Sequence, residues 1–312
     1  MRQAWPNPYV WPVCRIERPM PTIKSVKTAK LEISYVDAGP ADGPALLLLH
    51  GWPDDATTWD AVSPSLNAAG FRTIAPMLRG FGATRFLAAS MQRTGNQAVL
   101  AIDAIQMLDA LRIEHVFVAG HDWGATIAEM LAVGWPDRVT RIAMLSTPSR
   151  LGGLKSPPFW HARLQWYHWF QATKRGVEAV RRDPEGFARI MWETWSPQGW
   201  FDPATFQRVC RSFTNPDWLD VMLHSYQSRW DEAIPDPDSQ WLDDKVKATK
   251  TLHIPAIYIQ GAQDGVNPPP TSEAMGMKFT GGFQRIVLEG VGHFPTREAP
   301  EQVAALLVEH FR

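Results

Sequence analysis

The sequence predicts an α/β protein in which a mostly parallel, doubly wound sheet is interrupted by an inserted helical segment. Three observations support this fold class. Short apolar runs rich in branched residues alternate with segments of helical spacing, as in sheets covered by helices on both faces. The alternation stops between about residues 148 and 250, where helical spacing continues without a buried-strand pattern. The 312 residues suffice for one large domain that carries such an insertion.

The expected elements follow the chain in this alternating order. The expected strands are residues 22–27, 31–37, 45–49, 71–75, 115–119, 142–146, 256–260 and 285–289, of which the first two form a hairpin. The run at 45–49 contains only alanine and leucine, which is typical of a strand covered on both faces. The expected helices are residues 97–111, 125–133 and 300–311. Four segments follow: an N-terminal extension (1–21), a first core part (22–149), a helical cap (150–250) and a second core part (251–312).

Charge and hydropathy limit the expected partners. The net charge is -1 and the pI is about 6.8, without a basic run, so nucleic acid is not an expected partner. No stretch approaches the roughly 18 apolar residues of a membrane span, and no signal-peptide core precedes residue 22. We therefore expect a soluble cytoplasmic protein, in which Met20 is an alternative start.

The spacing of cysteine and histidine gives no sign of metal chemistry. Cys14 and Cys210 are the two cysteines and lie far apart, so no disulfide framework is expected. The nine histidines have neither an H-E-x-x-H pattern nor clustered ligand spacing. We expect no metal and no cofactor.

The most informative motif is the run from Gly120 to Gly124, which joins an expected strand to an expected helix. Strand, G-x-nucleophile-x-G and helix form a nucleophile elbow, a sharp turn that exposes its central side chain. The central residue here is Asp122, where a serine is more usual. A carboxylate is suited to displacement at saturated carbon, which leaves an alkyl ester that water can cleave. Aspartate is also common in ordinary turns, so the interpretation depends on suitable partners.

Those partners occur in the chain order of such a site. Residues 50–53, H-G-W-P, follow the third expected strand and would supply the backbone N–H of Trp52 to an oxyanion, with the N–H of Trp123 as second donor. Asp264 follows the strand at 256–260 and is the expected orienting acid. His293 lies between the last strand and the last helix and is the expected base.

These motifs resemble the epoxide hydrolase and dehalogenase branch of the α/β-hydrolase superfamily. They are H-G-W-P, the R-G-x-G of residues 79–82, G-H-D-W-G, the G-x-x-D loop and G-H-F, and the resemblance covers residues 22–312. It implies an α/β-hydrolase fold with a helical cap and a triad of Asp122, His293 and Asp264. The motifs are specific for the branch and less specific for the reaction, because both reactions begin with attack by an aspartate.

The leaving group separates the two reactions. An epoxide leaves as a strongly basic alkoxide and needs an acid, whereas a halide needs only N–H donors. The resemblance to epoxide hydrolases implies two lid tyrosines that hold the epoxide oxygen, and Tyr167 and Tyr226 match them. Nine of the 15 tryptophans lie between residues 160 and 241, and an aromatic lid of this kind favours an apolar substrate.

A dehalogenase is the alternative. The Tyr-His-Trp run that contains His168 and Trp169 also resembles haloacetate dehalogenases, where a His-Trp pair and a distant tyrosine bind halide. Those enzymes carry arginines just after the nucleophile to hold the substrate carboxylate, and the matching positions here are Trp123 and Thr126. A haloalkane dehalogenase would use the indole N–H of Trp123, with Trp52 as second donor if its side chain points inward.

The sequence is therefore interpreted as an epoxide hydrolase, monomeric or homodimeric, acting on a small apolar substrate. The expected catalytic residues are Asp122, His293, Asp264, Tyr167 and Tyr226, and the expected oxyanion and substrate-binding residues are Trp52, Trp123, His168 and Trp169. A non-catalytic binding protein on the same fold is a further alternative. It is disfavoured because both the base and the acid are present.

Overall fold

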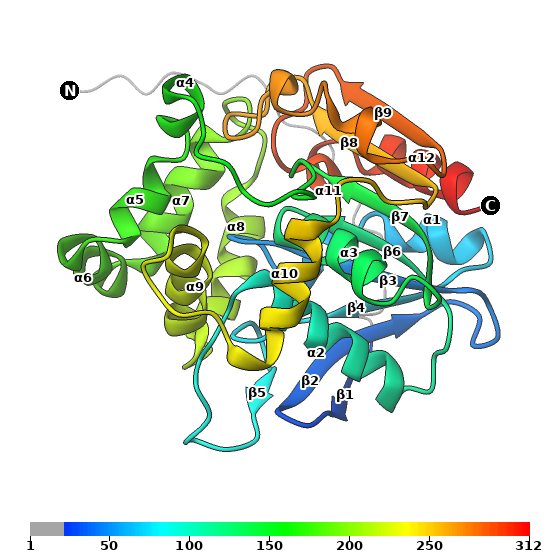
Figure 1. Ribbon diagram of the computed structural model, residues 1–312, viewed down its shortest axis with the longest axis horizontal. Helices are drawn as coiled ribbons and strands as arrows, with labels where there is room; N and C mark the ends of the chain where they lie inside the picture. Colours follow the sequence, from blue (N-terminus) through cyan, green and yellow to red (C-terminus); the bar gives the residue numbers. More distant parts are fainter. Residues whose placement is uncertain (1–21) are drawn as a thin grey trace, which may run out of the picture.

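A nine-stranded sheet lies at the centre of the molecule, which the computed structural model describes over residues 22–312 (Figure 1). The strands are β1 (Ile23–Lys27), β2 (Leu31–Ala38), β3 (Ala45–Leu49), β4 (Arg72–Pro76), β5 (Arg85–Phe86), β6 (Val116–His121), β7 (Val139–Leu145), β8 (Ala256–Gly261) and β9 (Phe283–Leu288). The expectations for residues 1–21, including Cys14 and a start at Met20, lie outside the described residues.

The strand order is β1-β2-β4-β3-β6-β7-β8-β9, with β5 paired to β2. The pairs of β2 with β1, β4 and β5 are antiparallel. From β4 onward every neighbouring pair is parallel. The predicted hairpin and the mostly parallel sheet are therefore confirmed.

Helices cover both faces of this sheet. The helices α1 (Ser63–Ala68) and α12 (Pro300–Phe311) contact each other on one face, and α2 (Gln97–Ala110) and α3 (Trp123–Gly134) contact each other on the opposite face. Leu46 and Leu48 of β3 pack into the α1/α12 core, whereas Leu47 and Leu49 pack into the α2/α3 core. Successive side chains of a strand point to opposite faces, so the all-apolar run is explained by burial on both sides.

The chain between β7 and β8, residues 146–255, forms a helical segment that we call the insertion. Its helices are α4 (Phe159–Ala162), α5 (Trp166–Gln171), α6 (Lys174–Arg182), α7 (Pro184–Thr194), α8 (Pro203–Cys210), α9 (Trp218–Gln227) and α10 (Gln240–Ala248). No strand occurs within these residues, all of which the structure describes. The helices α4 to α9 gather beside one end of the sheet, while α10 packs against α2 and α3 (Figure 1).

The remaining elements are short. They are α11 (Pro295–Glu298) and the 3-10 segments η1 (Ala56–Trp59), η2 (Arg211–Thr214), η3 (Ser228–Trp230), η4 (Pro237–Ser239), η5 (Pro269–Thr271) and η6 (Met275–Lys278). Within residues 22–312, no helix combines the length and the apolar character needed to cross a membrane.

Several helices of the insertion begin at local signals in the sequence. Asp183 and Asp202 precede α7 and α8, and each side chain accepts a hydrogen bond from a backbone N–H in the first turn of its helix. A proline occupies the first position of both helices, where the missing N–H costs no helical hydrogen bond. Thr173 caps α6 in the same way. These caps fix where each helix starts.

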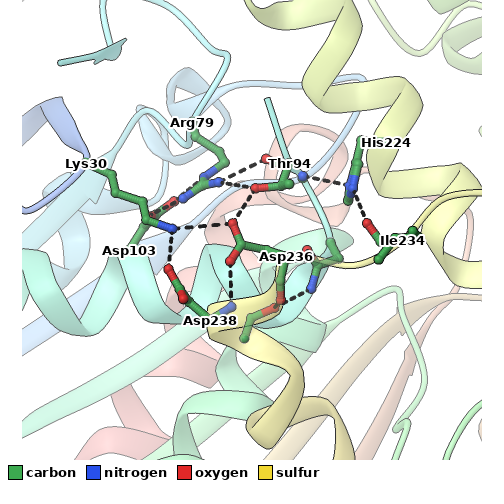
Figure 2. Close-up of polar contacts among 11 residues, drawn as sticks. Lys30, Arg79, Thr94, Asp103, His224, Ile234, Asp236 and Asp238 are labelled. Carbon is green, nitrogen blue, oxygen red and sulfur yellow. Dashed lines mark hydrogen bonds and ion pairs between the residues drawn. The ribbon is translucent and has the colours of Figure 1, made fainter. Parts of the chain in front are cut away.

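A buried polar network fastens the insertion to the core (Figure 2). Arg79 forms two hydrogen bonds to the carboxylate of Asp103 on α2, at 2.5 and 2.6 Å, and donates to the hydroxyl and carbonyl oxygens of Thr94. The Thr94 hydroxyl in turn donates to Asp236 of the insertion at 2.7 Å. Lys30 pairs with Asp238 at 2.8 Å and lies 3.5 Å from Asp236. The arginine of the R-G-x-G motif thus lies at the centre of a core-to-insertion contact.

Candidate active site

Asp122 occupies the turn between β6 and α3. Its backbone has φ 53° and ψ −110°, a conformation that residues other than glycine rarely adopt. A Cβ atom at Gly120 would overlap the carbonyl of Gly124, and one at Gly124 would overlap the carbonyl of Leu49. Only glycine therefore permits this approach of strand and helix, which is the geometry of a nucleophile elbow.

The carboxylate of Asp122 is buried and held from three directions. The backbone N–H of Trp52 donates to its Oδ1 at 2.9 Å, and the Thr147 hydroxyl lies 3.4 Å from Oδ2. His293 Nε2 lies 3.7 Å from the same Oδ2. Burial alone would raise the pKa of Asp122, but the hydrogen bonding and charge of His293 outweigh it and lower the pKa below its usual value. Asp122 is therefore an ionised carboxylate.

His293 is oriented by Asp264. The His293 Nδ1–H donates to Asp264 Oδ2 at 2.9 Å, and Oδ1 of the same carboxylate accepts the backbone N–H groups of Val266 and Asn267 at 2.9 and 2.8 Å. Burial would lower the pKa of His293, but the two carboxylates, Asp264 and Asp122, raise it to about 10. The imidazole is consequently an imidazolium between two carboxylates in the free protein.

His121 also supports the base, although the sequence analysis gave it no role. Its Nε2 donates to the backbone carbonyl of His293 at 2.7 Å. Burial, together with the charge of His293, lowers the pKa of His121 to about 4, so this ring stays neutral. The backbone N–H of His293 donates to the hydroxyl of Ser196, a residue of the insertion, at 2.8 Å. The position of His121 in the G-H-D-W-G motif, next to Asp122, could have indicated that it belongs to the site.

The two lid tyrosines lie together above Asp122. Tyr167 of α5 and Tyr226 of α9 are both buried, and their rings meet edge to face with centroids 5.4 Å apart. Burial raises the pKa of both phenols, which keeps their hydroxyl groups protonated. The indole of Trp52 points inward and stacks on Tyr167 at 5.9 Å. The indole N–H of Trp123 donates to the Tyr226 hydroxyl at 3.3 Å.

The structure separates the expected pair His168 and Trp169. His168 is buried at the cavity, and its Nδ1 accepts the indole N–H of Trp230 at 3.2 Å. Trp169 is 37% exposed and donates to the carbonyl of Ala162, away from the cavity. Adjacent residues on one helical turn point in different directions, so only His168 reaches the site.

The cavity beside Asp122 has a volume of about 330 Å³. Tyr167 and His168 line it, and so do three cationic residues, Arg150, Lys155 and Arg229. Trp123 and Thr126 occupy the positions just after the nucleophile, as expected, but Arg150 and Arg229 reach the cavity from elsewhere in the chain. Both arginines come from the insertion, far from the motifs, and no sequence signal connected them to Asp122. Among residues 22–312, no group of three or more His, Cys, Asp or Glu side chains is arranged to hold a metal ion.

Comparisons with known proteins agree with this geometry. Residues 44–300 match the model of the alpha/beta hydrolase fold family. Epoxide hydrolase 2 of Siraitia grosvenorii is 40% identical over 313 residues, covering 88% of this chain and 94% of that protein. Epoxide hydrolase A of Mycobacterium tuberculosis is 24% identical, with 93% and 97% covered.

A solved structure is similar over nearly the same length. The crystal structure of a candidate epoxide hydrolase from Klebsiella pneumoniae superposes with a TM-score of 0.87 at 35% identity, covering 92% of this chain and 96% of that one. The predicted fold class is therefore confirmed by both sequence and structural similarity. The chain is an enzyme of the α/β-hydrolase family and belongs to its epoxide hydrolase branch.

Proposed function

We propose that this protein is an epoxide hydrolase, which opens an epoxide to a diol through an ester formed on Asp122. The observation that carries the proposal is the convergence of three groups at one cavity. They are an ionised Asp122, the imidazole of His293 at 3.7 Å from it, and two buried phenols in contact with each other, of which Tyr167 lines the cavity together with Asp122. The relatives named as epoxide hydrolases also support it.

In the first step, Asp122 attacks the less hindered carbon of the epoxide. The carbon–oxygen bond of the ring breaks, and its electron pair moves to the oxygen, which becomes strongly basic. Tyr167 and Tyr226 supply O–H groups to this oxygen, and one of them transfers its proton. Because the Trp123 indole N–H donates to the Tyr226 oxygen, the Tyr226 hydroxyl hydrogen is free to point at the substrate.

In the second step, water cleaves the ester. His293 removes a proton from the water, and the resulting hydroxide attacks the Asp122 carbonyl carbon. As the tetrahedral intermediate collapses, His293 gives that proton to the leaving oxygen of the diol, and the proton released when the Asp122 carboxylate reforms restores the phenol that was deprotonated in the first step. The oxyanion is held by two backbone donors. One is the Trp52 N–H, which already bonds Asp122, and the other is the N–H of Trp123, which has no partner within α3 because it is the first helical residue.

Dehalogenation is supported less well. A halide site needs N–H donors, and two of the three candidates are not available: the Trp123 indole is engaged by Tyr226, and Trp169 lies away from the cavity. Of the three, only the buried indole N–H of Trp52 has no hydrogen-bond partner among residues 22–312, so one donor remains. Ester hydrolysis is disfavoured because attack of a carboxylate on an ester would give an anhydride with little gain.

The covalent step is tested by a single turnover of styrene oxide in heavy-oxygen water, followed by mass spectrometry of the peptides that contain Asp122 and Asp264. We expect one heavy oxygen in the Asp122 carboxylate and none at Asp264, since water attacks the acyl carbon of the ester. A diol whose new oxygen comes directly from water, with Asp122 unlabelled, would contradict the mechanism. Halide release from 1-bromobutane or bromoacetate without diol formation from styrene oxide would contradict the assigned reaction.

A further inference from the structure

We propose that the physiological epoxide carries a carboxylate, which Arg150 and Arg229 bind at the wall of the cavity that contains Asp122. This inference rests on the proposed function and adds a substrate class to it. It replaces the expectation of a purely apolar substrate, which was drawn from the tryptophan content of the lid.

Arg229 offers hydrogen-bond donors to a ligand. It lies in η3, directly after the helix of Tyr226, and its guanidinium carbon is 4.5 Å from the centre of the Tyr226 ring and 5.9 Å from that of Trp123. Its Nε and Nη2 atoms are buried and have no hydrogen-bond partner among residues 22–312. Leaving buried charged donors without a hydrogen bond costs folding free energy, so we expect these two nitrogen atoms to bind a ligand.

Arg150 faces the same space from the start of the insertion. Its backbone N–H donates to Glu129 at 2.7 Å, which fixes the chain, while its Nη1 makes a long contact of 3.4 Å to Gln97. Burial and then the charge of Arg229 lower the pKa of Arg150 to about 9. The two guanidinium groups are therefore close enough to repel each other.

The carboxylates nearest Arg150, Asp122 and Glu129, act on it through their charge without forming an ion pair with it. The ion pairs within 4 Å in the described part of the chain involve neither Arg150 nor Arg229. Asp122 is already paired with His293. An exposed lysine, Lys155, adds a further positive charge to the lining. A ligand carboxylate would satisfy both guanidinium groups, whose planar forks match its geometry.

The same contacts limit where the carboxylate lies in the substrate. Arg229 covers one face of the region around Tyr226, which is the proposed donor to the epoxide oxygen, and the cavity measures about 330 Å³. The carboxylate and the epoxide must therefore be a few bonds apart, or at opposite ends of one aromatic ring. Medium-sized epoxy acids fit this description.

The test compares a charged substrate with a neutral substrate of the same shape. The pairs are 4-(oxiran-2-yl)benzoate with its carboxamide, and 5,6-epoxyhexanoate with its carboxamide. We expect kcat/KM of the wild-type enzyme to favour at least one acid over its amide by about tenfold or more, the effect of one charged hydrogen bond. Equal values, or a preference for the amide in both pairs, would overturn the inference.

Variants connect the preference to the arginines. In Arg150→Gln and Arg229→Gln, the ratio of kcat/KM for acid over amide should fall about tenfold, and Arg229→Lys should keep part of it. The ratio cancels any general loss of activity. The matched control is Arg175→Gln, on the exposed surface of α6, which should keep the wild-type ratio. An unchanged ratio in both glutamine variants would overturn the assignment to these side chains.

A binding measurement separates this inference from the proposed reaction. Isothermal titration of wild-type enzyme with 3-phenylpropanoate and with 3-phenylpropanamide needs no epoxide chemistry. Tighter binding of the acid, lost in Arg229→Gln, supports the anion site even if no epoxide is opened. Diol formation from the amides together with equal binding of both ligands would keep the proposed function and overturn the anion site.

Discussion

In the free enzyme, the His293 ring lies between two carboxylates, 2.9 Å from Asp264 and 3.7 Å from Asp122. Both raise its pKa, to about 10. A protonated imidazole cannot accept a proton from water. Formation of the ester on Asp122 removes one of the two negative charges, so the pKa of His293 falls at the step where a base is required. Chemistry at one residue thus prepares the next residue for its role.

This coupling is tested by Asp122→Asn, which resembles the ester in having no charge. The pKa of His293 should fall from about 10 by roughly one to three pH units, the usual effect of one nearby opposite charge. Nitrogen NMR of the imidazole across a pH titration measures the change. Asp60→Asn, which removes a carboxylate paired with Arg208 at 3.1 Å, is the control and should leave the titration unchanged. An unaltered His293 pKa in Asp122→Asn would contradict the coupling.

Removing either lid hydroxyl should slow ring opening. In Tyr167→Phe and Tyr226→Phe, we expect the rate of ester formation to fall by about a hundredfold, the usual cost of losing one donor to a developing oxyanion. Stopped-flow tryptophan fluorescence measures this step. Tyr258→Phe is the matched control, because Tyr258 is buried in β8 and does not take part in the ring contact that joins Tyr167 and Tyr226. Losses below about threefold in both lid variants would contradict the acid role.

At the scale of elements, the position of the insertion depends on a few polar contacts with the core. Thr94 lies between Arg79 and Asp236, and the next residue, Gly95, donates its N–H to His224 Nδ1 at 2.9 Å (Figure 2). His224 therefore carries its proton on Nε2, which donates to the Ile234 carbonyl. The network joins the end of α9 and the loop before η4 to the core. Tyr226 lies only two residues beyond His224, so the network also positions the lid.

Replacing the central hydroxyl should loosen this contact. In Thr94→Val, Asp236 and Arg79 each lose a partner in a buried site, so the free energy of unfolding should fall by about 1–3 kcal/mol. Urea denaturation measures the loss, and hydrogen exchange should rise at residues 224–239. Thr214→Val is the control, since that exposed hydroxyl bonds only the Arg211 carbonyl of its own turn. Equal losses in the two variants would argue against a special role for the network.

At the scale of the whole molecule, the sheet was predictable because each central strand is buried on both faces. The short apolar runs at 45–49 and 256–260 were predicted to be strands, and both are strands of the sheet. The helix predicted at 300–311 has the bounds that were expected. The two-residue strand β5 and the helix α1 were missed, since two to six residues carry too little periodicity to be recognised.

The site was predictable only in part, for a related reason. The fold itself brings the triad together, because each member follows the carboxyl end of a parallel strand. Asp122 comes directly after β6, and Asp264 and His293 lie in the loops after β8 and β9. Arg150 and Arg229 meet only through the way in which the insertion packs over the sheet. No local pattern encodes that packing. The direction of Trp169, which points away from the cavity and donates to the carbonyl of Ala162, depends on it as well.

The insertion leaves the sheet after β7 and returns at β8, and these two strands are direct neighbours, with Leu145 opposite Ile259. An exchange of the segment between these two strands would give the enzyme a new lid. The catalytic residues would stay in the original core, because none of them lies in the insertion: they are Asp122, Asp264 and His293. The new segment would have to supply the hydrogen bond that the Ser196 hydroxyl now accepts from the backbone N–H of His293. Replacement of the whole insertion would therefore change the substrate pocket without changing the triad, provided that the new segment kept this contact and the contacts to Thr94 and Gly95.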